Sequence, residues 1–392
     1  MSDTNGAGLR VVPEPVGIRT ARTLPATWYA DSACFEREMH AVFRASWVCA
    51  GMLDEMPAAG HWTATRVGGV PTLLVRDRDG QLRAFVNVCR HRAAPLCEEG
   101  EIHGASLVRC PYHAWLYRLD GSLARASGVG EPDDFRLEDY SLKPLAITVW
   151  RRWVFVHADP SAAGFDPGPL GAAIDDFALD GLVEVMRESH ERPFNWKVLL
   201  ENYSENYHTP FVHPEIDTSS TQDYPMVANG LVLYAWDRTL RFDERTPAGS
   251  VDRLRAELLP GEPGWGAQAV AETGRPYDVG SYLTVWPNLM LNVFPDALLT
   301  MWMEPLTAGT VRVHRRMHAL PEVAANATRR EALVGAHRVV HLQDVEICTR
   351  VQRSHDAGVD ADGVLATVEE RGVFFVHQHL RAALRNHELR VR

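Results

Sequence analysis

The 392-residue sequence lacks the features that mark several classes of protein. No run of about 18 apolar residues occurs in it, so no membrane-spanning helix is expected. The first residues, MSDTNGAGLRVVPEPVG, contain no apolar stretch of the secretory kind. Six cysteines are too few for a disulfide scaffold in a chain of this length. These absences predict a protein of the reducing cytoplasm that is not inserted in a membrane.

Positive charge is also scarce. Lys and Arg number 40 against 51 Asp and Glu, which gives a formal net charge of -11. Binding to a phosphate backbone or to an anionic membrane surface needs clustered Lys and Arg, so we expect neither partner. What the chain does have is an ordinary globular composition, 46% hydrophobic and 23% charged. Its length suits two or three domains.

Hydrophobic patterning divides the chain into three parts. Residues 1–44 form an N-terminal segment, helical in spacing over 31–47, that we expect to pack on the larger C-terminal domain. Residues 45–158 read as short strands, with Asp-Gly turn signals at 79–80 and 120–121, which indicates a small antiparallel β domain. A Pro- and Gly-rich linker then opens the third part, 159–392.

This third part mixes helices and strands. Helices are expected near 195–208 and over 329–353, and strands at LVLYAW, SYLTVWPNLMLNVF and ALLTMWM. The predicted fold class is therefore α+β: a small antiparallel β domain, followed by a larger domain of helices on an antiparallel sheet.

Two short motifs place cysteine and histidine together. VNVCRHR sets Cys89 and His91 two apart, and CPYHAW sets Cys110 and His113 three apart around a proline. Both motifs fall at the ends of predicted strands, where two loops can clamp one cofactor between them. We therefore expect a metal centre held by these four side chains.

Two kinds of metal centre take two cysteines and two histidines. A tetrahedral zinc ion does, but zinc fingers usually pair Cys with Cys and His with His at short spacing. Here each loop supplies one of each, which suits a [2Fe–2S] cluster of the Rieske type, with both cysteines on one iron and both histidines on the other. The alternative without metal is two buried thiols and two surface histidines.

A second candidate metal site lies in the C-terminal half. His208 and His213 are five apart, and on one straight helix they would point about 140° apart. Pro210 ends or kinks such a helix, so both imidazoles can face one ion. Within 329–353, Asp344 is the one acid on a mostly apolar face, and a buried carboxylate must be paired or bind a metal. Two histidines and one carboxylate form the facial triad of non-haem Fe(II) oxygenases.

Asp344 and the polar residues near His208 can each be interpreted in two ways. A salt bridge to an arginine is the alternative role for Asp344. Asn202, Glu205 and His208 recur at i, i+3 and i+6, so they would share one strip of the helix predicted near 195–208. From spacing alone, that strip is either a solvated polar face or a buried, hydrogen-bonded one.

Together these motifs resemble the Rieske non-haem iron oxygenases. The resemblance rests on CRHRAAPLC at 89–97, CPYHAWLYRLDG at 110–121 and QDVEICTRVQ at 343–352, and it extends over nearly the whole chain. It implies a Rieske domain at 45–158 and a catalytic domain at 159–392. It also implies a [2Fe–2S] cluster and a mononuclear Fe(II), held respectively by Cys89, His91, Cys110 and His113, and by His208, His213 and Asp344.

The resemblance also assigns residues beside the iron. Glu205 corresponds to the acid three residues before the first iron histidine, and it and Asn202 are the candidate catalytic residues. Ring-hydroxylating dioxygenases mostly have Asp at this position, whereas Glu is similar to carnitine oxygenase and relatives that oxidise trimethylammonium compounds. Seven aromatic residues could cage an ammonium group, line a pocket for an aromatic ring or fill the core: Tyr224, Tyr234, Trp236, Tyr277, Tyr282, Trp286 and Trp302.

The function implied is that of an oxygenase component. Electrons would come from NAD(P)H through a separate reductase, because the chain has no G-x-G-x-x-G after a strand and no flavin fingerprint. The expected reaction is O2-dependent oxidation of a C–H bond, such as N-demethylation of a quaternary or N-methylated amine. Hydroxylation of an aromatic or natural-product substrate is the alternative, and a Rieske electron carrier is the alternative of another class. The resemblance further implies a homotrimer in which the cluster of one chain faces the iron of the next.

Overall fold

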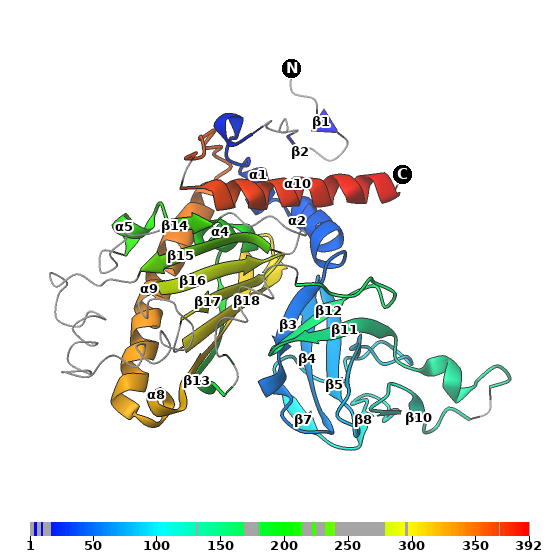
Figure 1. Ribbon diagram of the computed structural model, residues 1–392. Coiled ribbons are helices and arrows are strands. Elements are labelled where there is room, and N and C mark those ends of the chain that lie inside the picture. Colours follow the sequence, from blue (N-terminus) through cyan, green and yellow to red (C-terminus); the bar gives the residue numbers. More distant parts are fainter. Residues whose placement is uncertain are drawn as a thin grey trace. The chain divides into compact units, whose positions relative to one another are not determined.

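The computed structural model describes residues 17–130, 132–167, 179, 181–213, 222–224, 232–239, 279–294, 297–367 and 369–391 (Figure 1). It also describes the short paired strands β1 (Thr4–Asn5) and β2 (Leu9–Arg10). The chain divides into two compact units, one of residues 39–166 and one that joins 1–38 to 167–392.

The unit of residues 39–166 consists of two antiparallel sheets. A seven-stranded sheet has the order β3-β12-β11-β6-β5-β4-β7, and a three-stranded sheet has the order β10-β9-β8. The unit begins with a π-helical turn, and its elements are Met39–Phe43 (π), β3 Val48–Met52, a 3₁₀ turn Leu53–Glu55, β4 His61–Val67, β5 Val70–Arg76, β6 Leu82–Val86, β7 Ile102–Gly104, β8 Leu107–Arg109, β9 Leu116–Arg118, β10 Leu123–Arg125, a 3₁₀ turn Leu137–Tyr140, β11 Pro144–Trp150 and β12 Trp153–His157.

Both predicted Asp-Gly turns are confirmed. The first joins β5 to β6, with Gly80 at φ 81°, and the second joins β9 to β10, with Gly121 at φ 88°. A Cβ at Gly121 would lie 2.4 Å from the ring of Phe85, so both the backbone conformation and the space require glycine there. This close approach packs the turn between β9 and β10, which follow the CPYH motif, against β6, which precedes the CRH motif.

The second unit is built on one antiparallel sheet of order β13-β19-β18-β17-β16-β15-β14. Helices lie against it (Figure 1). Its elements are a 3₁₀ turn Ile18–Thr20, α1 Thr27–Ala30, α2 Ser32–Glu38, β13 Val183–Arg192, α4 Trp196–Tyr203, α5 Thr209–Val212, β14 Gln222–Tyr224, β15 Val232–Thr239, β16 Val279–Val285, β17 Leu289–Val293, β18 Ala297–Thr307, β19 Thr310–Ala319, α8 Pro321–Ala325, α9 Ala327–Asp356 and α10 Arg371–Val391.

Helices α4 and α9 cover the same face of this sheet. Cross-strand partners share a face, and residues two apart on one strand do so too. By this register Asn292 on β17 and Arg315 on β19 lie on one face. Tyr203 of α4 donates a hydrogen bond to Asn292 at 2.7 Å, and Arg315 donates one to the backbone of α9 at 2.8 Å. The sheet and the two helices therefore enclose a common inner layer.

Some predicted element bounds are wrong. The helix expected near 195–208 ends at Tyr203, because the Ser204 hydroxyl donates to the carbonyl of Leu200 at 2.6 Å and the chain then turns away. The helix expected over 31–47 is α2 followed by the π-helical turn that ends at Phe43. The helix expected over 329–353 is confirmed as α9.

Strands β13 and β19 are absent from the predicted strands because of their composition. VEVMRESHER and TVRVHRRMHA carry charged residues on both faces, which hides the alternation of a half-buried strand. In the fold they are direct neighbours, so that acidic and basic residues pair across them, as Glu188 does with Arg315. Only the pairing shows that these charged segments belong to the sheet.

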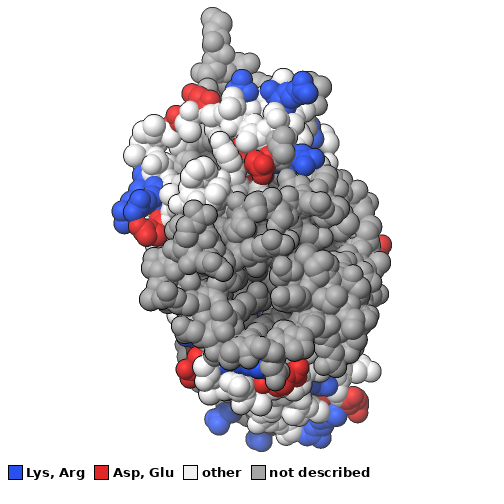
Figure 2. Space-filling model, turned by 60° about the vertical axis from the view of Figure 1, so that its left-hand side comes forward, with Lys and Arg blue, Asp and Glu red and all other residues white. Residues whose placement is uncertain are grey.

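The described residues contain no candidate membrane span and no disulfide. No helix in the described ranges combines the length and the hydrophobicity that a membrane span requires. On the face shown in Figure 2, acidic and basic side chains are interspersed. All six cysteines are buried free thiols.

Candidate metal centres

Cys89 and Cys110 begin two loops with the same backbone pattern. In each loop the cysteine N–H donates to the carbonyl five residues later, at 2.8 Å. The cysteine carbonyl accepts from the N–H four residues later, at 3.0 Å in the first loop and 3.1 Å in the second. That fourth residue has φ 56° at Ala93 and 57° at Ala114. The loops after β6 and β8 thus present one cysteine each in matching conformations.

The two sulfurs of these loops are buried, and the imidazoles lie nearer the surface. Cys89 is 2% exposed and Cys110 is 1% exposed, whereas His91 is exposed and His113 is half-buried. The rings of His91 and His113 are 4.6 Å apart, and His91 stacks on Trp115 at 4.9 Å. The two cysteine sulfurs are therefore buried in the domain, and the two histidine nitrogens lie closer to its surface.

This arrangement fits a two-iron cluster better than a zinc ion. A tetrahedral zinc would bring four ligand atoms within about 4 Å of one another. Among the described residues, only the triad His208, His213 and Asp344 brings three or more ligand atoms all within 4.8 Å. The Cys and His side chains of the two loops form separate sulfur and nitrogen pairs, as a Rieske [2Fe–2S] cluster requires.

Tyr117 contacts this site from β9. Its hydroxyl lies 3.3 Å from Sγ of Cys89 and accepts from the N–H of Arg90 at 2.9 Å, which leaves its own proton to donate to the sulfur. Burial and the contact with Cys89 raise the pKa of Tyr117, so the hydroxyl stays protonated. The sequence offered a signal, because Tyr117 is part of CPYHAWLYRLDG, but only the fold turns it toward Cys89.

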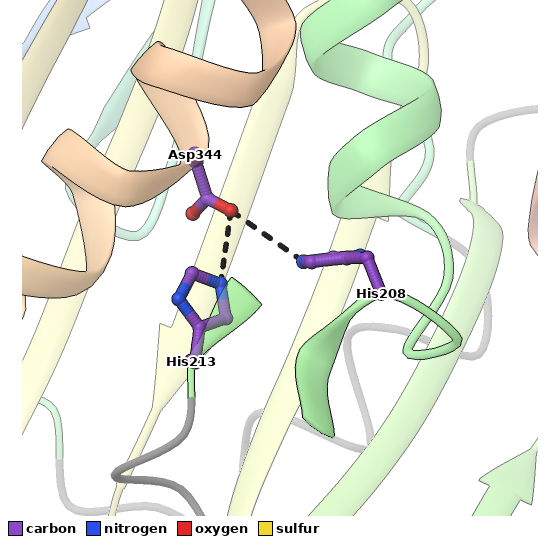
Figure 3. Close-up of side chains that lie close together, drawn as sticks. All are labelled: His208, His213 and Asp344. Atoms are coloured by element: carbon purple, nitrogen blue, oxygen red, sulfur yellow. Dashed lines mark hydrogen bonds and ion pairs between the residues drawn. The ribbon is translucent and has the colours of Figure 1, made fainter. Parts of the chain in front are cut away.

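His208, His213 and Asp344 converge from three segments (Figure 3). Oδ1 of Asp344 lies 3.0 Å from Nε2 of His213 and 3.4 Å from Nε2 of His208. His208 precedes the short helix α5 and His213 follows it, with Pro210 in its first turn, where proline is tolerated. The predicted convergence is present, although a separate turn of helix, and not a kinked continuation of α4, produces it.

Each histidine of this triad is also held on its other nitrogen. Nδ1 of His208 hydrogen-bonds Oε1 of Glu205, and Nδ1 of His213 hydrogen-bonds Oε1 of Gln343 at 2.7 Å. Metal-ligating histidines usually donate this second N–H to an oxygen, which fixes the ring and leaves Nε2 free for the metal. Two Nε2 atoms and one carboxylate oxygen are the donor set that Fe(II) takes in non-haem oxygenases. The residues present therefore fit a mononuclear iron.

The charges of the triad reinforce one another. Burial acts against ionisation of Asp344, but hydrogen bonds from His208 and His213 outweigh it and hold the pKa of Asp344 well below its ordinary range. Burial would likewise lower the pKa of His208, yet Asp344 and Glu205 raise that pKa to about 9. Without metal, the carboxylate of Asp344 stays ionised and His208 is protonated, so His208 must release a proton before its Nε2 can bind a cation.

Glu205 and Asn202 do not share a helical strip with His208. Glu205 lies in the loop after α4, is 8% exposed, and accepts the backbone N–H of His208 at 3.1 Å through its second oxygen. Asn202 remains on α4 and is half-buried. The structure thus gives Glu205 two contacts to His208, while the catalytic roles of Glu205 and Asn202 stay predictions.

A buried polar network anchors α4 to the N-terminal segment. Lys197 donates to both oxygens of Glu38, at 2.7 and 2.8 Å, and neither side chain is exposed to solvent. Trp196 donates to the same carboxylate at 2.8 Å, and the Tyr29 hydroxyl donates to Glu201 at 2.7 Å. These contacts fix the helix that leads into Glu205 and His208.

The seven candidate pocket aromatics fall into separate groups. Tyr282 faces α4, with its ring 6.3 Å from that of Tyr203. Trp302 stacks on His314. The alternation of side chains along the strands places both residues on the face of the sheet that points away from α4 and α9. Trp286 lies 6.0 Å from Trp196. Tyr277 and the side chains of three others lie outside the described residues: Tyr224, Tyr234 and Trp236.

Known proteins resemble both halves of the chain. The family of the ring hydroxylating alpha subunit (catalytic domain) matches residues 179–386, and the Rieske [2Fe-2S] domain matches residues 46–140. The carnitine monooxygenase oxygenase subunit of Escherichia coli (strain K12) is 34% identical over 240 residues, 58% of this chain and 64% of that protein. The chloroplastic choline monooxygenase of Spinacia oleracea is 27% identical over 377 residues, 93% of this chain and 79% of that protein.

Solved structures extend the likeness to the fold. A quaternary ammonium Rieske monooxygenase in complex with an inhibitor has a TM-score of 0.75 at 25% identity, covering 93% of this chain and 95% of that one. Naphthalene 1,2-dioxygenase from Rhodococcus sp. has a TM-score of 0.72 at 19% identity, covering 92% of this chain and 94% of that one, and shares the fold. The predicted α+β fold is confirmed.

These findings also set the limits of the likeness. The chain spans 64% of the length of the Escherichia coli relative, which is slightly less than two thirds. The catalytic-domain family, by contrast, matches more than half of this chain, and the Rieske domain matches a separate range that precedes it. Both predicted cofactors, a [2Fe–2S] cluster and a mononuclear iron, follow from these two domains and from the His-His-Asp triad. The chain belongs to the ring-hydroxylating alpha subunit family and carries a Rieske [2Fe–2S] domain ahead of its catalytic domain.

Proposed function

We propose that this chain is the oxygenase component of a Rieske system that oxidises a C–H bond of an N-methylated or quaternary amine. The observation that carries the proposal is the triad of His208, His213 and Asp344, with Nδ1 of each histidine held by an oxygen. An electron carrier would have no use for this second metal site. When bound, the two metal groups supply one-electron transfer and the activation of O2.

The chain's own residues hold and orient these groups. Cys89, His91, Cys110 and His113 are the proposed cluster ligands, and the Tyr117 hydroxyl donates to the first of them. Glu205 and Gln343 fix the two iron-binding imidazoles, and Glu205 with Asn202 are the proposed catalytic residues. The proposed functional division is the N-terminal segment 1–44, the Rieske domain 45–158 and the catalytic domain 159–392.

Two features support an amine substrate. Glu205 occupies the position where the family of aromatic dioxygenases mostly has Asp, and the relatives named above act on carnitine and choline. A row of aromatic rings also crosses the inner layer from α4 to α9, through Tyr203, Tyr282, Phe294 and His337, with neighbouring centroids 5.5–6.3 Å apart. Aromatic faces attract quaternary ammonium groups. The same aromatic rings could also contact an aromatic substrate, so hydroxylation of an aromatic ring is the alternative reaction.

The proposed assembly is a head-to-tail homotrimer served by a separate NAD(P)H-dependent reductase in the cytoplasm. The four cysteines outside the proposed cluster form no disulfide, which supports a reducing compartment. In such a trimer, heterologous contacts close into a ring, and His113 of one copy would face Glu205 of the next. A carboxylate oxygen can accept more than one hydrogen bond, so Glu205 could hold His208 and a neighbouring copy's His113 together.

Metal analysis of three proteins tests the two sites. The wild type should hold about three irons and two sulfides per chain, the sum of a [2Fe–2S] cluster and one ion. Cys110→Ala should lose the visible cluster spectrum and keep one iron, whereas Asp344→Ala should keep the spectrum and lose one iron. A spectrum that survives Cys110→Ala contradicts the cluster assignment, and three irons in Asp344→Ala contradict the triad.

Turnover tests the reaction. With a competent reductase, NADH and O2, the wild type should convert a trimethylammonium compound with release of formaldehyde or trimethylamine. A panel of aromatic acids is the comparison, and oxidation of those alone would favour the alternative reaction. Glu205→Gln should retain both metal groups and turn over at least about tenfold more slowly, since it weakens a charge-assisted hydrogen bond.

Mixed trimers test the assembly. Cys110→Ala and Asp344→Ala, each inactive alone, should recover activity when co-expressed, because some junctions then pair an intact cluster with an intact iron site on the neighbouring chain. Differently tagged chains would show that mixed trimers form. Mixed trimers without activity would overturn the route between chains and leave the metal assignments untouched.

A further inference from the structure

The imidazoles of the two proposed metal centres are held in different ways. In the triad, Nδ1 of each histidine is hydrogen-bonded to an oxygen. Among the residues that the structure describes, neither the ring of His91 nor that of His113 has a hydrogen-bond partner. Metal-ligating histidines usually have such a contact, which fixes the orientation of the ring. Within this chain, the rings of the two cluster histidines are therefore oriented by contacts of another kind.

A buried tryptophan stacks on the ring of His91. The two ring planes are 8° apart with centroids 4.9 Å apart, and Trp115 is 2% exposed. Phe135 and Tyr140 make T-shaped contacts with the indole, at 5.9 and 5.6 Å. Nε1 of Trp115 is buried without a hydrogen-bond partner among the described residues, so packing alone holds the indole. An indole packed on several sides restricts the rotation of the imidazole that lies on it.

An exposed tyrosine covers the ring of His113. Tyr112 is 55% exposed, yet its ring lies against that of His113, with centroids 3.7 Å apart and planes 32° apart. The guanidinium of Arg92 lies 5.4 Å from the centroid of the Tyr112 ring, within the distance at which a cation is attracted to an aromatic face. A tyrosine this exposed contributes little to the core, so core packing does not explain its contact with His113.

Core packing is the other explanation for Trp115, and a second stack in the same unit shows why it must be considered. Trp62 is 7% exposed and stacks on His103, with centroids 5.7 Å apart and planes 19° apart. His103 belongs to neither cysteine motif, and its Nε2 pairs with Glu101 at 3.1 Å. A stack of tryptophan on histidine does not by itself indicate a function. Trp115 and Tyr112 differ because each lies on a proposed cluster ligand whose ring lacks a hydrogen bond.

We propose that Trp115 and Tyr112 are positioning residues for the imidazole ligands of the cluster, Trp115 for His91 and Tyr112 for His113. The inference rests on the proposed cluster ligands and not on the substrate. A Rieske cluster transfers single electrons, and ligands that keep their orientation between the two oxidation states reduce the reorganisation that each transfer requires. The two supports differ in kind, because Trp115 is fixed from within the core whereas Tyr112 is held at the surface beside Arg92.

Pulsed EPR of the full chain, loaded with its cluster and reduced with dithionite, tests the proposal without turnover. The reduced cluster is paramagnetic, and each coordinated nitrogen has its own hyperfine coupling, which depends on the orientation of its ring. Tyr112→Leu should shift or broaden one of the two couplings, and Trp115→Met should do so for the other. Methionine fills much of the space of the indole without a flat aromatic face. Tyr112→Phe and Trp115→Phe keep a ring and should restore couplings near the wild-type values.

The rate at which the cluster is lost to a chelator is a second measurement. Tyr112→Leu and Trp115→Met should each accelerate the decay of the visible cluster spectrum about 2- to 12-fold, the factor that corresponds to the loss of one aromatic pair. Arg92→Gln should have a smaller effect, on the same hyperfine coupling that Tyr112→Leu alters. Because Tyr112 is exposed, its variants decide the proposal even if Trp115→Met does not fold.

Trp62→Met is the matched control, because it removes an indole from a histidine that is not a proposed ligand. It should leave both couplings unchanged and the rate of cluster loss within about twofold of the wild type. Equal effects of Trp62→Met and Trp115→Met would indicate general loosening of the core and overturn the role of Trp115. Wild-type couplings in both Tyr112→Leu and Trp115→Met would overturn the proposal and leave the cluster assignment intact. A wild type without the EPR signal of a reduced [2Fe–2S] cluster would overturn both.

Discussion

Gln343 and Asp344, consecutive residues of α9, contact the two opposite nitrogens of one imidazole. Oε1 of Gln343 lies 2.7 Å from Nδ1 of His213, and Oδ1 of Asp344 lies 3.0 Å from its Nε2. The amide oxygen can only accept, so Nδ1 carries the proton and Nε2 keeps the lone pair that a metal needs. Helix α9 thus supplies one proposed metal ligand, Asp344, and sets the tautomer of another, His213.

Replacement of Gln343 should therefore weaken iron binding. Gln343→Leu removes the acceptor and should lower the affinity for Fe(II) about 10- to 100-fold, the usual cost of losing such an outer contact. Gln343→Glu should keep most of the affinity, because a carboxylate accepts the same proton. Iron content after dialysis against a chelator measures the effect. Glu346→Gln, which changes an exposed residue of the same helix, is the control and should retain iron. Equal retention by Gln343→Leu would contradict the assignment.

Tyr117 should tune the cluster. Its hydroxyl lies 3.3 Å from Sγ of Cys89, and hydrogen bonds to cluster sulfurs raise the reduction potential because they stabilise the more negative, reduced state. Tyr117→Phe should keep the cluster spectrum and lower the potential by several tens of millivolts, since roughly 1 kcal/mol corresponds to about 40 mV for one electron. Redox titration followed by EPR measures it. An unchanged reduction potential would show that the Tyr117 hydroxyl does not hydrogen-bond a sulfur of the cluster.

The ion pair of Glu38 and Lys197 should matter most for stability. Both side chains are fully buried, so Glu38→Gln would leave an ammonium without its charge partner. The expected loss in unfolding free energy is about 3–5 kcal/mol. The double variant Glu38→Leu with Lys197→Met removes both charges and should recover much of that loss. Urea denaturation of the three proteins compares them, and a double variant as unstable as Glu38→Gln would contradict the electrostatic explanation.

His341 should make the catalytic unit sensitive to acid. Its pKa is lowered to about 3, below the ordinary value near 6.5, so the unfolded chain takes up a proton at a pH where the folded chain does not. The stability contribution is therefore complete above pH 6.5 and declines as the pH falls toward 3, by about 1.4 kcal/mol per unit over most of that interval. Denaturation of the wild type and His341→Asn at pH 7, 6 and 5 measures it. The wild type should lose more stability than the variant, and parallel losses would refute the assignment.

The sequence by itself determined the donor sets of both proposed metal centres. Cysteine and histidine at spacings of two and three, and two histidines around Pro210, are local features that survive any uncertainty about helix ends. Asp344 could be selected because α9 is long and its periodicity marks a single acid on an apolar face. The Asp-Gly turns are likewise decided by neighbouring residues. These features share one physical cause, because each depends on chain geometry over a few residues.

Tertiary structure alone decided the contacts between distant segments. The Ser204 side chain ends α4 and frees Glu205 to bind His208, a competition between local hydrogen bonds that periodicity does not reveal. Tyr117 reaches Cys89 across 28 residues, and Arg315 meets Glu188 across 127, because strand pairing sets which side chains are neighbours. Charged strands such as β13 and β19 carry no hydrophobic alternation, so their place in the sheet depends on partners that only the folded chain brings together.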